Sequence, residues 1–301
     1  MRSTTILALS LTAAAASAQT TANFDQPTFD RWNYPFGPGG DRETISTFYP
    51  GFTPGLFDDR DAQALVSYVT AGNFAPGQGA ENYVITGARV VATIATDSAF
   101  AYDPTADSFR STLLPSDPRF TPDTDAGLPI ELYGTGFNAG LNAFAYGEDF
   151  NWGAGGPTQE DVRFAFAADF DGSGNLRNVS NNVRDGFETN PFAVGQASVT
   201  PGDLVASGTE FAFDLDVNNP AIAGYLADGL DLGILSFSLS SLHPAAQGGA
   251  VEFPDFWSKE SPDGPAIRFE ITAEVIPAPM TAGVLGLGLL GAARRRRSST
   301  R

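Results

Sequence analysis

Three stretches of the chain alternate apolar with polar or small residues, and this pattern limits the fold more than any other feature. They run over 162–170, 211–217 and 267–275. Successive side chains of a β-strand point to opposite faces, so each stretch predicts a strand with one face on a core. In the first stretch we expect the apolar residues to face the core. The other face then holds the small or polar residues Arg163, Ala165, Ala167 and Asp169.

Further strands are predicted over 83–95, 130–133 and 232–242. The stretch 83–95 is apolar on both sides of the pleat, which is typical of a strand covered on both faces. One good helix is predicted, from a cap at Asn219 until Gly229. Residues 58–62 are expected to form a charged turn, and 102–105 and 117–127 to form surface turns because they are rich in Pro, Asp and Thr.

Many strands, Gly and Pro turns and no β-α-β rhythm predict an all-β fold. We expect a two-sheet β-sandwich, jelly-roll-like, with long loops and one short helix. No shift in composition divides residues 19–275, so they are expected to form one domain. The chain has no cysteine, and 24 phenylalanines supply apolar area for a core that holds without disulfides.

Both ends of the chain differ from this body. Residues 1–18 combine Arg2, an apolar stretch and Ala16-Ser17-Ala18, which predicts a secretory signal peptide cut after Ala18. Residues 276–301 combine a proline-marked joint, an apolar run and a basic stop. This order predicts a separate C-terminal hydrophobic helix that holds the chain at a membrane. The joint contains Pro277 and Pro279, and the stop is formed by Arg294, Arg295, Arg296 and Arg297.

This ending resembles the PEP-CTERM sorting signal of bacterial exosortase substrates. Pro277-Ala278-Pro279 stands where Pro-Glu-Pro is usual. The resemblance implies that an exosortase-like membrane enzyme cleaves near Pro279 and passes the protein to the cell surface or extracellular matrix. A plain tail anchor without cleavage is the alternative. Separately, 256–267 is similar to the last strands of DNRLRE-type surface β-sandwich modules, which are related to carbohydrate-binding families.

The body is strongly acidic. It holds all 35 acidic residues and 11 of the 17 basic ones, a formal charge of −24. Nucleic acid and anionic lipid are poor partners for such a surface, because binding to phosphate relies on Lys and Arg. Divalent cations and neutral glycans, including extracellular polysaccharide, are compatible with it.

A calcium site is one candidate, at Asp169, Asp171, Ser173 and Asn175. Oxygen side chains at alternate positions around a glycine turn suit a hard cation such as Ca²⁺. Position twelve of an EF-hand-type loop would be Ser180 instead of a bidentate Glu. The alternative is a hairpin turn that uses Asp, Gly and Asn for backbone reasons alone.

Aromatic rings are the second candidate. Trp32, Tyr34 and Phe36 alternate along an extended stretch, and Trp257 lies in another aromatic segment. Exposed rings of this kind stack on sugars, whereas buried ones belong to the core. We favour the core interpretation for both groups.

No catalytic residue is predicted. His243 is the only histidine, Lys259 is the only lysine, and no Gly-x-Ser-x-Gly elbow exists. The expected role is therefore structural or adhesive, without enzymatic activity. A glycan-binding module, assisted by Ca²⁺, is the alternative, and a carboxylate-based glycan hydrolase or lyase is the third hypothesis.

Overall fold

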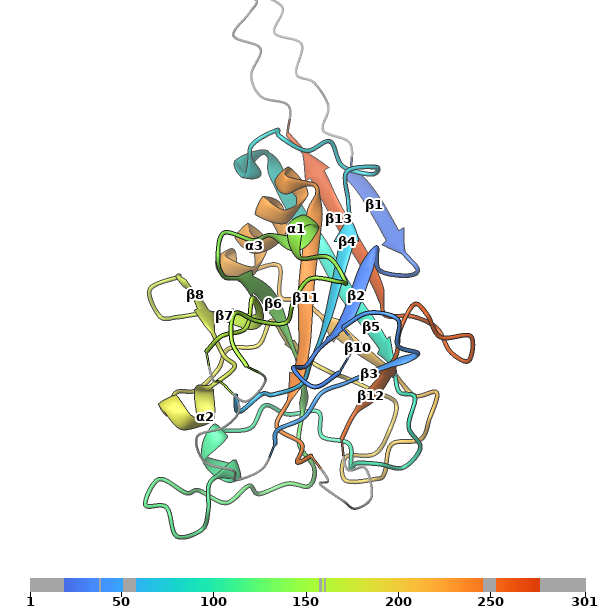
Figure 1. Ribbon diagram of the computed structural model, residues 1–301. Coiled ribbons are helices and arrows are strands. Elements are labelled where there is room, and N and C mark those ends of the chain that lie inside the picture. The colour runs from blue at the N-terminus through green and yellow to red at the C-terminus, as the bar shows by residue number, and fades with distance from the viewer. Residues whose placement is uncertain are drawn as a thin grey trace, which may run out of the picture.

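The computed structural model describes residues 19–37, 39–50, 58–156, 159, 161–245 and 253–276, and all the strands of this part of the chain lie in antiparallel sheets (Figure 1). The structure is mostly β with few short helices. One sheet has the strand order β1-β13-β5-β10. Its strands are β1 (Gln19–Phe24), β13 (Arg268–Val275), β5 (Tyr83–Thr93) and β10 (Glu210–Asp214).

The larger sheet has the order β2-β4-β11-β6-β7-β8, and β9 also pairs with β6. Its strands are β2 (Phe29–Asn33), β4 (Gln63–Val69), β11 (Ile234–Ser241), β6 (Ile130–Phe137), β7 (Ala165–Phe170), β8 (Leu176–Asn178) and β9 (Ala193–Val194). A third, two-stranded sheet joins β3 (Thr44–Ser46) to β12 (Asp255–Trp257).

The two larger sheets share one hydrophobic core. The ring of Phe269 on β13 lies 5.2 Å from that of Tyr68 on β4 and 5.0 Å from that of Phe237 on β11. The Tyr68 hydroxyl also donates to the carbonyl of Ile267, at 2.9 Å. The alternation over 211–217 and 267–275 is confirmed within β10 and β13, where Phe211, Phe213, Phe269, Ile271 and Ala273 are the buried residues.

The predicted helix is α3 (Pro220–Leu232), and the Asn219 side chain caps it by accepting from the backbone N–H of Ala221. Its predicted end at Gly229 is wrong. A Cβ on Gly229 would lie 2.2 Å from Cδ2 of Leu235, so this glycine permits close packing inside the helix. The helix ends at Gly233, which takes the left-handed conformation that favours glycine. Strand β11 begins after it, at Ile234.

Four shorter helical segments accompany α3 in the described chain. They are the α-helices α1 (Ala143–Tyr146) and α2 (Asn182–Asp185) and the 3₁₀ helices η1 (Ala80–Asn82) and η2 (Phe109–Thr112). The prediction of a single helix missed these one-turn segments, which are too short to show a helical period. No helix among the described residues is both long and apolar enough to cross a membrane.

Strand β5 corrects the prediction of a strand covered on both faces. Its residues alternate between buried and exposed, and Val84 is 41% exposed. The apolar residues of one face point into the shared core, while Arg89 on the other face pairs with Asp214 of β10. Solvent therefore covers the outer face of this sheet, even at some of its valines.

Strand β7 corrects the prediction about its two faces. The small or polar side chains are the most buried, including Ala165, Ala167 and Asp169, each 0% exposed. They contact residues outside the shared core, such as Tyr146 and Val179 in two smaller clusters. Both faces of β7 are therefore covered by other residues. The alternation separates a face with large side chains from a face with small or polar ones, and it does not separate core from solvent.

The charged segment 58–62 is a turn, and it is buried rather than exposed. Asp58, Arg60 and Asp61 are each at most 2% exposed. Arg60 pairs with Glu131 at 2.5 Å, and Asp58 pairs with Arg163. Because a buried charge requires a partner, these two arginines determine where the segment lies.

The two ends of the described chain lie together. Gln19 of β1 is paired with Glu274 of β13 in antiparallel register. Figure 1 shows this end of the molecule opposite the loops between β5 and β6, which carry η2. The body therefore has one end from which both flanking segments leave and one end formed by loops.

Candidate functional site

The ring row predicted from Trp32, Tyr34 and Phe36 is continuous in space. Ring centroids are 4.4 Å apart between Trp32 and Tyr34 and 5.5 Å apart between Tyr34 and Phe36. Exposure increases along the row, since Trp32 packs against the core and Phe36 is 51% exposed. The row therefore runs from the core to the surface.

One face of Trp32 is already used by the protein. The guanidinium of Arg42 lies over its ring at 4.2 Å from the centroid, and its indole N–H donates to the carbonyl of Ser46 at 3.0 Å. A Cβ on Gly37 would lie 2.6 Å from the same ring. A ligand that stacks in this region would therefore contact Tyr34 and Phe36 more readily than Trp32.

Trp257 lies in β12 and is partly buried. The backbone of Gly264 lies against its indole, because a Cβ there would be 2.0 Å from Cδ1. Its neighbour Phe256 is fully buried in the shared core. Sugar stacking at Trp32, Tyr34 and Trp257 stays a prediction, and these contacts favour packing at the two tryptophans.

The segment 169–175 forms the turn between β7 and β8. Asp171 accepts from the backbone N–H groups of Ser173 and Asn175, at 2.8 and 2.9 Å. Asp169 is fully buried, and both of its carboxylate oxygens accept from the guanidinium of Arg177. These contacts are those of a hairpin turn with a buried ion pair, and the calcium site at Asp169, Asp171, Ser173 and Asn175 stays a prediction.

Three carboxylates surround the only lysine. The ammonium of Lys259 contacts Glu148, lies 3.0 Å from Glu260 and lies 3.6 Å from Asp30. Asp30 is 1% exposed, and burial raises its pKa to about 6, against the opposing charge of Lys259. Glu148 also lines a surface pocket with the rings of Phe29 and Phe150. Since Lys259 contacts all three carboxylates, the group is an ion-pair network at the edge of that pocket.

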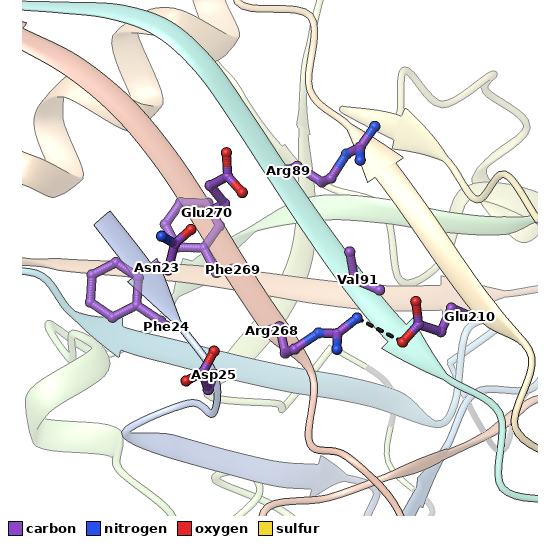
Figure 2. Close-up of a pocket in the computed structure, with 9 residues that line it drawn as sticks. All are labelled: Asn23, Phe24, Asp25, Arg89, Val91, Glu210, Arg268, Phe269 and Glu270. Carbon is purple, nitrogen blue, oxygen red and sulfur yellow. Dashed lines mark hydrogen bonds and ion pairs between the residues drawn. The ribbon is translucent and has the colours of Figure 1, made fainter. Parts of the chain in front are cut away.

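A second pocket lies on the outer face of the four-stranded sheet (Figure 2). Charged side chains dominate it, and Arg268 pairs with Glu210 at 2.8 Å across β13, β5 and β10. Phe269 belongs to its lining but is buried in the core below. The pocket offers charges of both signs, which differs from the mostly apolar lining of a typical ligand pocket.

His243 is 3% exposed and packs edge-on against Phe100, with ring centroids 5.0 Å apart. Neither ring nitrogen has a hydrogen-bond partner among the described residues. Burial lowers the pKa of His243 to about 3. The histidine is therefore neutral at ordinary pH and belongs to the packing of the protein.

The residues of the sorting segment, Pro277, Pro279, Arg294, Arg295, Arg296 and Arg297, and the predicted signal peptide lie outside the described residues. Sequence reasoning missed the buried pairs of Arg60 and Arg163, although Arg163, a lone arginine in an apolar stretch, was a visible indication. Comparison of the chain with protein-family models and with curated proteins finds no match.

Proposed function

We propose that the chain is an exported cell-surface or extracellular-matrix protein with a structural or adhesive role, processed through its C-terminal segment. The observation that carries this proposal is where the strands lie relative to the two terminal segments. Strand β1 begins at Gln19, directly after the expected cleavage site, and β13 ends at Val275, directly before the proline-marked joint. The body is a two-sheet β-sandwich of jelly-roll type in this proposal, supported by the core shared between its sheets.

The pairing of β1 with β13 supports a defined orientation for that body. Because Gln19 and Glu274 are partners, a membrane-held tail and the exported N-terminus leave from the same end. The loops between β5 and β6 then face away from the membrane (Figure 1). An acidic body held in this way is suited to an outer layer of the cell, because its negative charge disfavours contact with anionic lipid.

The test is the intact mass and the membrane fractionation of the protein from its native cells. The wild-type chain is compared with a variant in which Arg294 to Arg297 are all replaced by Gln. A matched control replaces the exposed Arg110 and Arg119 by Gln, which changes charge in the body and leaves the tail intact. We expect wild type and control to lose both terminal segments and to reach the surface.

The Arg294–Arg297 variant is expected to keep its C-terminal segment and to stay in the membrane fraction. A tail that is retained in the wild-type protein would contradict processing and leave a plain anchor. Recovery of the protein in the cytoplasm, with residues 1–18 attached, would overturn export itself.

Glycan binding is the second candidate, favoured by the ring row that ends at the surface with Phe36. Replacing Tyr34 by Ala is expected to weaken polysaccharide binding, because Tyr34 connects the buried and exposed rings. The control replaces Phe144 on α1, which is 48% exposed. Tryptophan fluorescence that no polysaccharide changes would contradict this role.

A further inference from the structure

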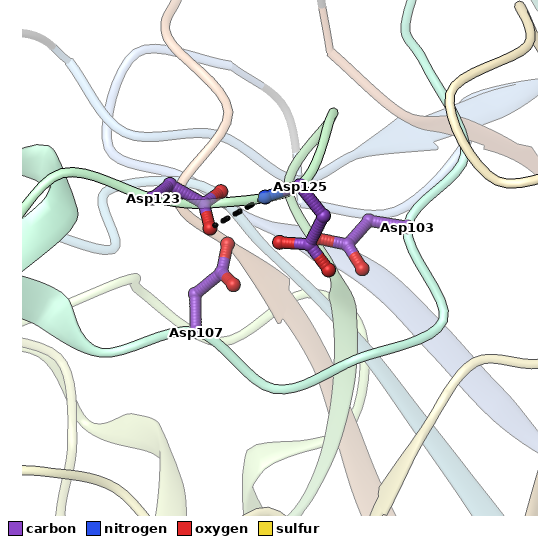
Figure 3. A group of neighbouring side chains, drawn as sticks. All are labelled: Asp103, Asp107, Asp123 and Asp125. Carbon is purple, nitrogen blue, oxygen red and sulfur yellow. Dashed lines mark hydrogen bonds between the residues drawn. The ribbon is translucent and has the colours of Figure 1, made fainter.

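Four aspartates converge at the loop end of the molecule (Figure 3). Asp103 and Asp107 precede η2, and Asp123 and Asp125 precede β6. Each offers a carboxylate oxygen, and these oxygens all lie within 4.8 Å of one another. Both loops were expected to be ordinary surface turns, so the sequence pattern did not indicate that they meet.

The contact between the two loops is built by their backbones. Gly127 has φ of +104°, and a Cβ there would lie 2.8 Å from the carbonyl oxygen of Ala101. The Thr105 hydroxyl lies 2.7 Å from Oδ1 of Asp103 and 2.9 Å from Oδ2 of Asp125. Glycine is therefore required at 127 for the loops to approach, and Thr105 bridges them.

The body also holds this region in place. The Tyr102 hydroxyl accepts from the backbone N–H of Ala197 at 3.0 Å, and the carbonyl of Pro104 accepts from Nε2 of Gln196 at 2.9 Å. Tyr102 itself is buried in the shared core. The first pair of aspartates is thus attached to a packed residue on one side and to the β9–β10 connection on the other.

Asp103 points into the group without a partner for one of its oxygens. Its side chain is 2% exposed, Oδ1 accepts from Thr105, and Oδ2 has no hydrogen-bond partner. Oδ2 of Asp107 is buried and unpartnered as well. An unpaired buried carboxylate oxygen is costly, which indicates that these oxygens bind a ligand.

The described residues supply no cation here. Within the described part of the protein, none of the four aspartates forms an ion pair with Lys or Arg. The other group of converging carboxylates, Asp30, Glu148 and Glu260, contains Lys259, whose positive charge offsets part of their negative charge. Those three carboxylates thus share a lysine, whereas the four aspartates have no Lys or Arg partner among the described residues.

We propose that Asp103, Asp107, Asp123 and Asp125 bind one Ca²⁺ ion, a site separate from the 169–175 turn and additional to the proposed surface role. Carboxylate oxygens are the ligands of a hard cation, and Ca–O distances of about 2.3–2.6 Å place opposite ligands about 4.6–5.2 Å apart. The spacing of at most 4.8 Å fits one such ion. The ion would replace the mutual repulsion of the four carboxylates by attraction and would fasten the two loops together.

The experiment measures Ca²⁺ binding by calorimetry and thermal unfolding of the purified full chain, in EDTA and in millimolar Ca²⁺. The variants are Asp107→Asn and Asp125→Asn at the site, and Asp171→Asn at the 169–175 turn. Glu260→Gln, in the group around Lys259, controls for removal of an acidic charge. Matched additions of Mg²⁺ and NaCl separate specific binding from screening.

We expect Ca²⁺ to bind the wild-type chain once and to raise its unfolding temperature. Asp107→Asn and Asp125→Asn should each weaken binding about tenfold or more, because affinity depends on the number of charged ligands. Asp107→Asn should also unfold at a higher temperature than wild type in EDTA, since one repelling charge is gone. The Asp171→Asn and Glu260→Gln variants should bind Ca²⁺ as the wild type does.

Three results would overturn the site. One is a wild-type chain that ignores Ca²⁺. Another is a response that NaCl of equal ionic strength reproduces. The third is a response that Asp171→Asn abolishes while Asp107→Asn and Asp125→Asn retain it, which would place the ion in the β7–β8 turn. If the C-terminal segment is never processed, the proposed surface role fails but the calcium site is unaffected. The two proposals can therefore fail independently.

Discussion

Nε of Arg163 lies 2.5 Å from Oδ2 of Asp58, and both side chains are 1% exposed. The same guanidinium donates through Nη2 to the backbone carbonyls of Arg60 and Asp61. One arginine therefore holds the whole 58–61 turn against the start of β7. The neighbouring pair of Arg60 and Glu131 attaches this turn to β6.

Replacing Arg163 by Met is expected to lower the free energy of unfolding by about 3–5 kcal/mol, because it leaves Asp58 charged and buried. Urea unfolding measures the effect. The matched control is Arg89→Met, which breaks an exposed pair with Asp214 and should change stability by about 0–1 kcal/mol. Equal losses in the two variants would contradict the role given to the buried pair.

We predict that His243 makes the folded protein less stable in acid. Its pKa is about 3 in the folded chain, against an ordinary value of 6.5. Between these values the unfolded chain binds a proton and the folded chain does not, so this group favours unfolding as pH falls below 6.5. Its contribution at pH 4.5, relative to pH 8, is a loss on the order of 2–3 kcal/mol.

His243→Phe keeps the ring beside Phe100 and removes the proton site, so the comparison isolates this group. Unfolding at a series of pH values should show the variant gaining on the wild type only below pH 6.5. Raised aspartate pKa values such as that of Asp30 act in the opposite direction in both proteins, and they cancel in the difference. A difference that does not vary with pH would contradict a buried neutral histidine.

Lys259→Gln is expected to destabilise the protein by about 2–4 kcal/mol at pH 8, because Asp30 then lies buried and charged without a cation. The pKa of Asp30, already about 6, should rise further in this variant. The folded state then takes up a proton as pH falls, so the loss should shrink by pH 5. Arg268→Gln, in an exposed pair, is the control and should show no such trend.

Two glycines of α3 give opposite predictions for the same substitution. Gly224→Ala meets no atom within 4 Å and should stabilise the helix by about 0.5–1 kcal/mol. Gly229→Ala meets Leu235 and should destabilise the protein by about 1–3 kcal/mol. Thermal unfolding of both variants checks the pair, and a gain in both would show that Leu235 moves aside freely.

The strands that alternate between core and solvent could be predicted from the sequence. Strands β10 and β13 show this, because one face of each meets the core and the other meets water. The helix cap at Asn219 could also be predicted, because a capping residue is recognised from its immediate neighbours in the sequence. Strand β7 was misinterpreted because alternation reports only that two faces differ. Which face is buried depends on residues outside the strand, such as Arg177 of β8 and Asp58, which is distant in sequence.

The local conformation of two candidate segments could be predicted from the sequence, whereas what they bind stays a prediction. The turn at 169–175 lies where expected, and the ring row of Trp32, Tyr34 and Phe36 is continuous. The four aspartates were missed because each pair looks like an ordinary polar loop. Their meeting depends on the approach at Gly127, and a short sequence window does not show which loops become neighbours.

Strand β13 is paired on both sides, with β1 and with β5. It is also the last strand of the described chain, so β1 and β5 have no strand between them until residue 275 has been synthesised. A chain that is still being synthesised therefore cannot complete this sheet before residues 268–275 are available. Such long-range pairing makes folding slow and late. The first strand of the described chain thus waits for the last one before it is joined to the rest of its sheet.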